Sequence, residues 1–70
     1  MTDTEALVKL IEDSGLKYKF IAEQLGISYF SLNKKINNIT EFKTSEVSKL
    51  CQLLKIDSPK EKEKIFLKIK

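Results

Sequence analysis

The sequence predicts an all-α fold of five short helices around one core. Apolar residues recur at three- and four-residue spacings along most of the chain, which is typical of helices with one buried face. Capping residues and isolated glycines separate these stretches. A chain of 70 residues, of which 41% are hydrophobic, is long enough for a single core only. We therefore expect one domain over residues 1–70.

The first helix is expected to begin near Thr2, where Thr2-x-x-Glu5 matches a capping box. Apolar residues follow at i, i+3 and i+4 from Leu7. The helix should end at Gly15, because glycine adopts the left-handed conformation of a C-cap at low cost.

The second helix is predicted over residues 18–25, with Gly26 closing it. Ser28 is a favourable N-cap for a third helix over residues 29–37. Leu32 and Ile36 are the only evident buried anchors of this third helix. Its other side chains, including both lysines, have no expected role in the core.

The fourth helix should begin near Thr44 or Ser45, after a loop in which Ile39 and Phe42 are expected to fill the core. Ser58-Pro59 predicts the start of a fifth helix, because proline suits the first helical position. The chain end is ambiguous. Ile65, Phe66 and Ile69 would form a helical stripe, whereas Ile65, Leu67 and Ile69 alternate as in a strand.

The expected core draws on four of the five predicted helices and on the turns between them. Cys51 lies on the apolar stripe of the fourth helix and is expected to be a small buried hydrophobic residue. The other expected core residues are Leu7, Leu10, Ile11, Ile21, Ala22, Leu25, Ile27, Leu32, Ile36, Val47, Leu50, Leu54 and Ile56.

The composition argues against an enzyme. The chain has no histidine, arginine or tryptophan and one cysteine, so neither a zinc site nor a Cys/His nucleophile pair is expected. The two glycines are isolated, and no glycine-rich phosphate loop is present. We expect no cofactor, no metal and no membrane association. One unpaired cysteine and the lack of a signal peptide indicate a cytoplasmic protein.

Charge is distributed unevenly along the chain. Residues 1–16 carry a net charge of −3, whereas residues 17–43 carry +3. A cationic segment after an acidic helix suits a polyanionic partner on one side of the molecule, although a merely solvated lysine-rich surface would give the same pattern.

Two short helices joined through Gly26-Ile27-Ser28 form the most specific feature of the sequence. The stretch Ile21-Ala22-Glu23-Gln24-Leu25-Gly26-Ile27-Ser28, followed by Leu32 and Ile36-Asn37-Asn38, resembles the helix-turn-helix family of phage Cro proteins and repressors. The similarity covers roughly residues 6–56, with the helix-turn-helix unit at about 18–37. It implies a lambda-repressor-like fold and a DNA-binding transcriptional regulator of a phage or prophage switch, with double-stranded operator DNA as its partner.

In that family the helix after the turn lies in the major groove of DNA. The residues that would face the bases by position are Tyr29, Phe30, Ser31, Asn33 and Lys34. Asparagine pairs with adenine, lysine approaches guanine, and an aromatic ring packs on a thymine methyl. The candidates for phosphate contact are Lys17 and Tyr18, with Asn37, Asn38, Thr40 and Lys43. The absence of arginine removes the most frequent bidentate reader of guanine.

The aromatic pair Tyr29-Phe30 supports an alternative, since this helix tip usually carries polar side chains in the family. The same helix face would bind a partner protein, the cognate phage repressor, with weak or no DNA binding of its own. A third possibility is that one ring, Phe30 first, turns into the core. The only candidate for a dimer contact is the short segment 65–69, so we expect a monomer or weak homodimer.

Overall fold

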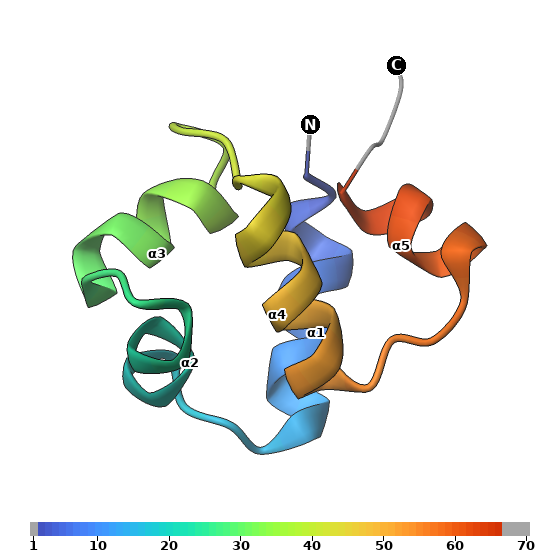
Figure 1. Ribbon diagram of the computed structural model, residues 1–70, viewed down its shortest axis with the longest axis horizontal. Helices are drawn as coiled ribbons and strands as arrows, with labels where there is room; N and C mark the ends of the chain where they lie inside the picture. The colour runs from blue at the N-terminus through green and yellow to red at the C-terminus, as the bar shows by residue number, and fades with distance from the viewer. Residues whose placement is uncertain (1, 67–70) are drawn as a thin grey trace.

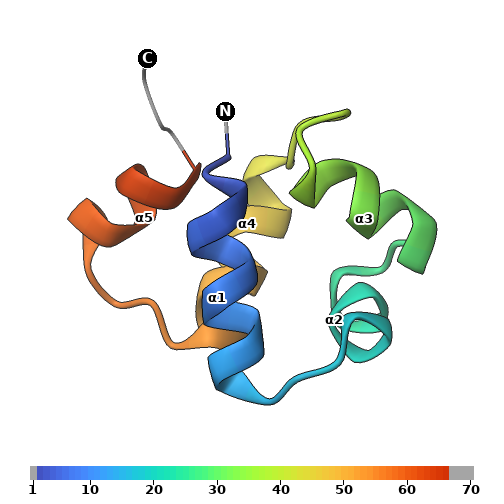
Figure 2. The ribbon, with the colours of Figure 1, turned by 180° about the vertical axis from the view of Figure 1, so that it is seen from behind.

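The computed structural model describes residues 2–66, which form five α-helices and contain no strand. The helices are α1 (Thr4–Ser14), α2 (Tyr18–Leu25), α3 (Tyr29–Ile36), α4 (Thr44–Leu54) and α5 (Pro59–Phe66). The all-helical prediction is confirmed over this part of the chain. Helices α1 and α4 cross in the middle of the molecule, with α2 and α3 on one side and α5 on the other (Figures 1 and 2).

The core consists of apolar side chains from all five helices. Leu7, Ile21, Leu32 and Leu50 are fully buried, and a side chain of this kind contributes about 1.5–3 kcal/mol when removed from water. Cys51 is buried among them, as expected. The expected core residues that are only partly buried pack against this cluster: Leu10, Leu25, Ile27, Val47 and Leu54.

The start of α1 differs from the predicted capping box at Thr2. Asp3 is the N-cap, and its carboxylate accepts a hydrogen bond from the amide of Ala6 at 3.2 Å. Thr2 is buried instead, and its backbone pairs with the side chain of Asn38, which both accepts from the Thr2 amide and donates to the Thr2 carbonyl. The first residues of the chain are therefore attached to the end of α3.

The turn between α2 and α3 follows the predicted pattern. Gly26 has a φ of 72° in the left-handed region, and its amide closes the last turn of α2 on the carbonyls of Ala22 and Glu23. Ser28 then caps α3, because its Oγ accepts from the amide of Ser31 at 3.0 Å. These local interactions set the direction in which α3 leaves α2.

Ile39 was predicted to fill the core, and this prediction is wrong. Its amide closes the end of α3 on the Lys34 carbonyl at 2.9 Å, while its side chain is 69% exposed. Phe42 is partly buried against the core and packs edge-to-face on Phe66, with ring centroids 5.7 Å apart.

The two interpretations of the chain end differ in residues 65–69. Ile65 and Phe66 are buried residues of the helix α5, so the strand interpretation is wrong where the structure describes the segment. Leu67 and Ile69 lie outside the described residues. Ile65 is also bonded to the start of the chain, because its carbonyl accepts from the amide of Asp3 at 2.6 Å.

Candidate nucleic-acid interface

Helix α3 separates into a buried half and an outward half. Leu32, Lys35 and Ile36 are buried. The other side chains of α3 and the adjacent Asn37 are exposed or partly exposed and form its outward half: Tyr29, Phe30, Ser31, Asn33, Lys34 and Asn37. All five predicted base-contacting residues therefore lie in the outward half of α3.

The tip of α3 carries two exposed aromatic rings. Tyr29 is 56% exposed and Phe30 is 69% exposed, so the expectation that Phe30 turns into the core is wrong. The reason is the helix phase: Leu32 and Ile36 fill the core side, and Phe30 lies nearly opposite Leu32 on the α3 surface.

Phe30 is held against the lysine one turn along the helix. The ammonium nitrogen of Lys34 lies 4.7 Å from the centroid of the Phe30 ring, within the range of a cation–π interaction. The ring and the ammonium group thus form one unit on the outward half of α3.

The remaining predicted base-contacting residues make hydrogen bonds within α3. The Oγ of Ser31 accepts from the Oγ of Ser28 at 3.1 Å, beside the N-cap bond. The side-chain amide of Asn33 donates to the carbonyl of Tyr29 at 3.1 Å. This bond uses one of the two N–H groups of the Asn33 amide, so a bidentate contact with adenine would use the other N–H together with Oδ1.

The start of α2 lies next to the tip of α3. The rings of Tyr18 and Tyr29 have centroids 6.3 Å apart and are tilted by 45°. Burial, together with the nearby Glu12 and Tyr29, raises the pKa of Tyr18 above its ordinary value of 10.0, so its hydroxyl stays a donor at neutral pH. Lys17 precedes it, is exposed and does not cap α2 with its side chain.

The second predicted phosphate cluster is only partly directed outward. Thr40 and Lys43 are exposed on the loop between α3 and α4. Asn37 donates to the carbonyl of Asn33 at 2.9 Å. Asn38 instead holds the chain start, through Thr2 and a 3.3 Å bond to the hydroxyl of Thr4, so its first role is structural.

A buried ion pair was not expected from the sequence. The ammonium group of Lys35 donates to Oε1 of Glu46 at 2.6 Å, and both residues are buried. The same carboxylate accepts from the amide of Lys43 at 2.8 Å and so caps α4. The only signal for this pair was the position of Lys35 three residues after Leu32, which places it on the core side of α3.

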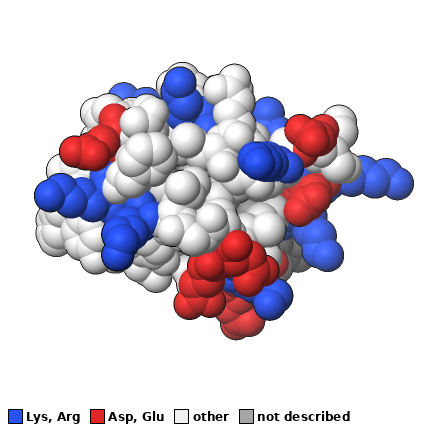
Figure 3. Space-filling view, turned by 90° about the horizontal axis from the view of Figure 1, so that it is seen from below, with Lys and Arg blue, Asp and Glu red and all other residues white. Residues whose placement is uncertain are grey.

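Because Lys35 is paired with Glu46, the outward positive charge of residues 17–43 comes from other lysines. Lys17, Lys34 and Lys43 supply that charge near α3, and α3 itself contains no acidic residue. In Figure 3 the largest group of acidic side chains lies at the lower edge, and smaller acidic groups lie at the left and at the right of the same view. The surface of α3, which contains no acidic residue, is therefore the part of this side best suited to a polyanion.

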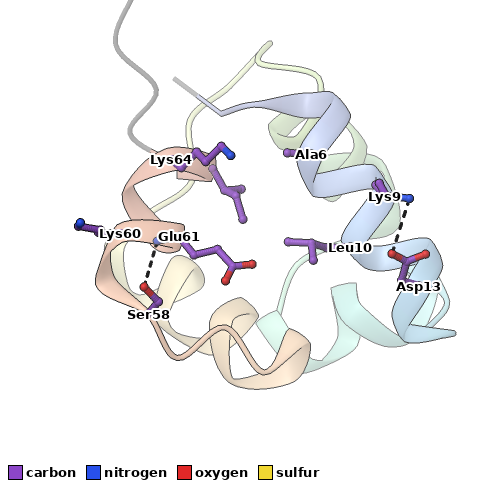
Figure 4. A pocket seen from close by; sticks show the side chains of 9 residues that line it. Ala6, Lys9, Leu10, Asp13, Ser58, Lys60, Glu61 and Lys64 are labelled. Atoms are coloured by element: carbon purple, nitrogen blue, oxygen red, sulfur yellow. Dashed lines mark hydrogen bonds and ion pairs between the residues drawn. The ribbon is translucent and has the colours of Figure 1, made fainter.

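An open groove of about 490 Å³ lies between α1 and α5. Leu10 enters it from α1, while Glu61 and Lys64 line the wall formed by α5 (Figure 4). Lys9 and Asp13 form a weak ion pair at its rim, 4.0 Å apart. No predicted site residue lines this groove.

Residues 2–66 contain no group of three or more His, Cys, Asp or Glu side chains placed to hold a metal ion. Among the described helices, none is both long and apolar enough to cross a membrane.

The chain belongs to a family described as a protein of unknown function (DUF739), whose model matches residues 3–68. No curated protein and no solved structure matches it significantly.

Proposed function

We propose that this protein is a DNA-binding transcriptional regulator of a phage or prophage switch, related to the Cro and repressor helix-turn-helix proteins. In this proposal α3 lies in the major groove of operator DNA, which is wide enough to admit an α-helix. Base contacts come from the outward half of α3, and phosphate contacts from Lys17, Tyr18 and the loop that contains Lys43.

The observation that carries the proposal is the division of α3 into two halves. Leu32 and Ile36 anchor the helix in the core, while its outward half bears side chains without a core role and no carboxylate. The Tyr18 ring lies beside Tyr29, and the exposed Lys17 and Lys43 stand at the starts of α2 and α4, where they supply donors to a phosphate backbone.

The direct test is selection of bound duplexes from a random-sequence double-stranded DNA library by the full chain. We expect enrichment of one sequence class, bound with an affinity that falls steeply as salt is raised. Absence of an enriched class at low salt would overturn the proposal.

The selected duplex then allows the role of Lys34 to be tested. Lys34→Ala is expected to weaken binding by about 1–3 kcal/mol and to blur the preference at one base pair. Lys60→Ala, on the far helix α5, is the matched control and should bind as the wild type does. An unchanged base preference in Lys34→Ala would remove this residue from the base-contacting set.

A second candidate function is supported by the exposure of Tyr29 and Phe30. Two neighbouring exposed rings are costly in water but are good anchors of a protein interface. In this alternative the same face of α3 binds the cognate phage repressor, and the protein acts as an anti-repressor.

The two functions are separated by the variants Tyr29→Ala and Phe30→Ala. Loss of a repressor complex with unchanged binding to the selected duplex would favour the anti-repressor. Loss of binding to the selected duplex with an unchanged repressor complex would exclude Tyr29 and Phe30 from the repressor interface.

A further inference from the structure

The outward half of α3 presents two exposed aromatic rings. Phe30 is 69% exposed and Tyr29 is 56% exposed. The hydroxyl of Ser31 accepts a hydrogen bond from Ser28, one N–H of the Asn33 amide donates to the Tyr29 carbonyl, and the chain has no guanidinium group. Part of the polar capacity of α3 is therefore used locally, whereas both rings are available for an apolar contact.

The Phe30 ring is also restrained before any partner binds. The Lys34 ammonium group lies 4.7 Å from its centroid, so the cation–π contact limits the positions that the ring adopts. A restrained apolar group loses less conformational entropy on binding than a free one, which favours a shape-specific contact.

We propose that α3 recognises the 5-methyl groups of pyrimidines, in thymine and in 5-methylcytosine, through the ring of Phe30. The inference rests on the proposed DNA binding and specifies the chemistry of its target. The 5-methyl group is the one apolar feature that a base pair presents in the major groove. Duplex DNA is the favoured occupant because the Lys34 ammonium group lies over the Phe30 ring, the exposed Lys17 directly precedes the Tyr18 ring that packs beside Tyr29, and α3 has no carboxylate.

The test uses the duplex selected by the full chain, with each thymine replaced singly by uracil. Uracil keeps every hydrogen-bonding group of thymine and lacks only the methyl. We expect the dissociation constant to rise about fourfold at one or two positions, which corresponds to about 0.8 kcal/mol for one buried carbon. Fluorescence anisotropy titration measures this ratio.

Phe30→Ala should bind the thymine and uracil duplexes equally at those positions. Ile39→Ala is the matched control, since Ile39 is as exposed as Phe30 but lies beyond the end of α3, and it should keep the fourfold ratio. Circular dichroism confirms that each variant keeps its helices.

The second arm separates methyl recognition from recognition of thymine as a whole. At a sensitive position, a pair containing 5-methylcytosine should bind about fourfold more tightly than the same pair containing cytosine. If a duplex is selected but no position responds to uracil, or if Phe30→Ala responds as the wild type does, the methyl inference fails while DNA binding stands. If no duplex is selected, the proposed function itself fails.

Discussion

At the scale of single residues, two neighbouring lysines of α3 have opposite roles. Lys35 is buried against Glu46, whereas the Lys34 ammonium group lies over an exposed ring. Sequence alone did not separate them, because both are lysines in a cationic segment and only the helix phase distinguishes their environments. The difference assigns Lys35 to stability and Lys34 to binding.

Lys35→Met should lower the free energy of unfolding by about 3–5 kcal/mol, because it leaves the Glu46 carboxylate buried without its cationic partner. Lys34→Met is the control, and its effect should stay within about 1 kcal/mol, since only the cation–π contact is lost. Urea denaturation of both variants measures the difference. Equal destabilisation would contradict the assigned roles.

The ion pair of Lys35 with Glu46 makes the free energy of unfolding depend on pH. Burial alone would raise the pKa of Glu46, but hydrogen bonds from Lys35 and from the Lys43 amide outweigh it and hold this pKa below its ordinary value of 4.5. A lowered pKa in the folded state contributes stability that is complete above the ordinary value and is lost as pH falls through the folded value.

Glu46→Gln should therefore be less stable than the wild type at neutral pH, and the difference in stability should narrow as the pH falls below the ordinary pKa of 4.5. Thermal unfolding followed by circular dichroism across this range tests the expectation. A gap of constant size would show that the carboxylate charge of Glu46 is not what stabilises the fold.

At the scale of helices, the glycine-capped ends of α1 and α2 were the most predictable features and the loop after α3 was the least predictable. Gly15 and Gly26 end α1 and α2 in the left-handed conformation, because glycine tolerates it without a Cβ clash. The end of α4 gave no such signal, since Lys55 takes this conformation with a φ of 57°. The prediction for Ile39 failed because an apolar residue in a loop cannot be distinguished from a core residue by sequence alone.

Lys55→Gly should raise the free energy of unfolding by about 1 kcal/mol, because a lysine in the left-handed region carries a strain that glycine lacks. For a chain of this size the melting temperature should rise by about 4–8 °C. Asn38→Gly is the contrasting variant: Asn38 has a φ of 63°, but its side chain bonds to Thr2 and Thr4, so the melting temperature should fall.

At the scale of the whole molecule, the helical class, the single core and the outward half of α3 followed from periodicity and capping. The ion pair of Lys35 with Glu46 and the attachment of Asn38 to Thr2 did not, because they join residues far apart in sequence. The candidate interface was thus predictable as a helix face, whereas its individual hydrogen bonds depended on packing that sequence patterns do not encode.

The salt dependence of DNA binding belongs to this scale. Lys43→Ala should weaken binding to all DNA sequences alike and should reduce the slope of log affinity against log salt concentration by about one, because one phosphate contact is lost. Titrations of the selected duplex and an unrelated duplex at several salt concentrations measure both effects. A change confined to the selected duplex would identify Lys43 as a base-reading residue instead.

The central claim is that the outward half of α3 is the DNA-binding surface. The most direct measurement is the change in backbone amide NMR shifts of the full ¹⁵N-labelled chain on addition of the selected duplex. The claim predicts the largest changes at residues 29–34, at the start of α2 and in the loop before Lys43, with little change along α1 and α5. Changes concentrated on the groove between α1 and α5, with α3 unaffected, would contradict it.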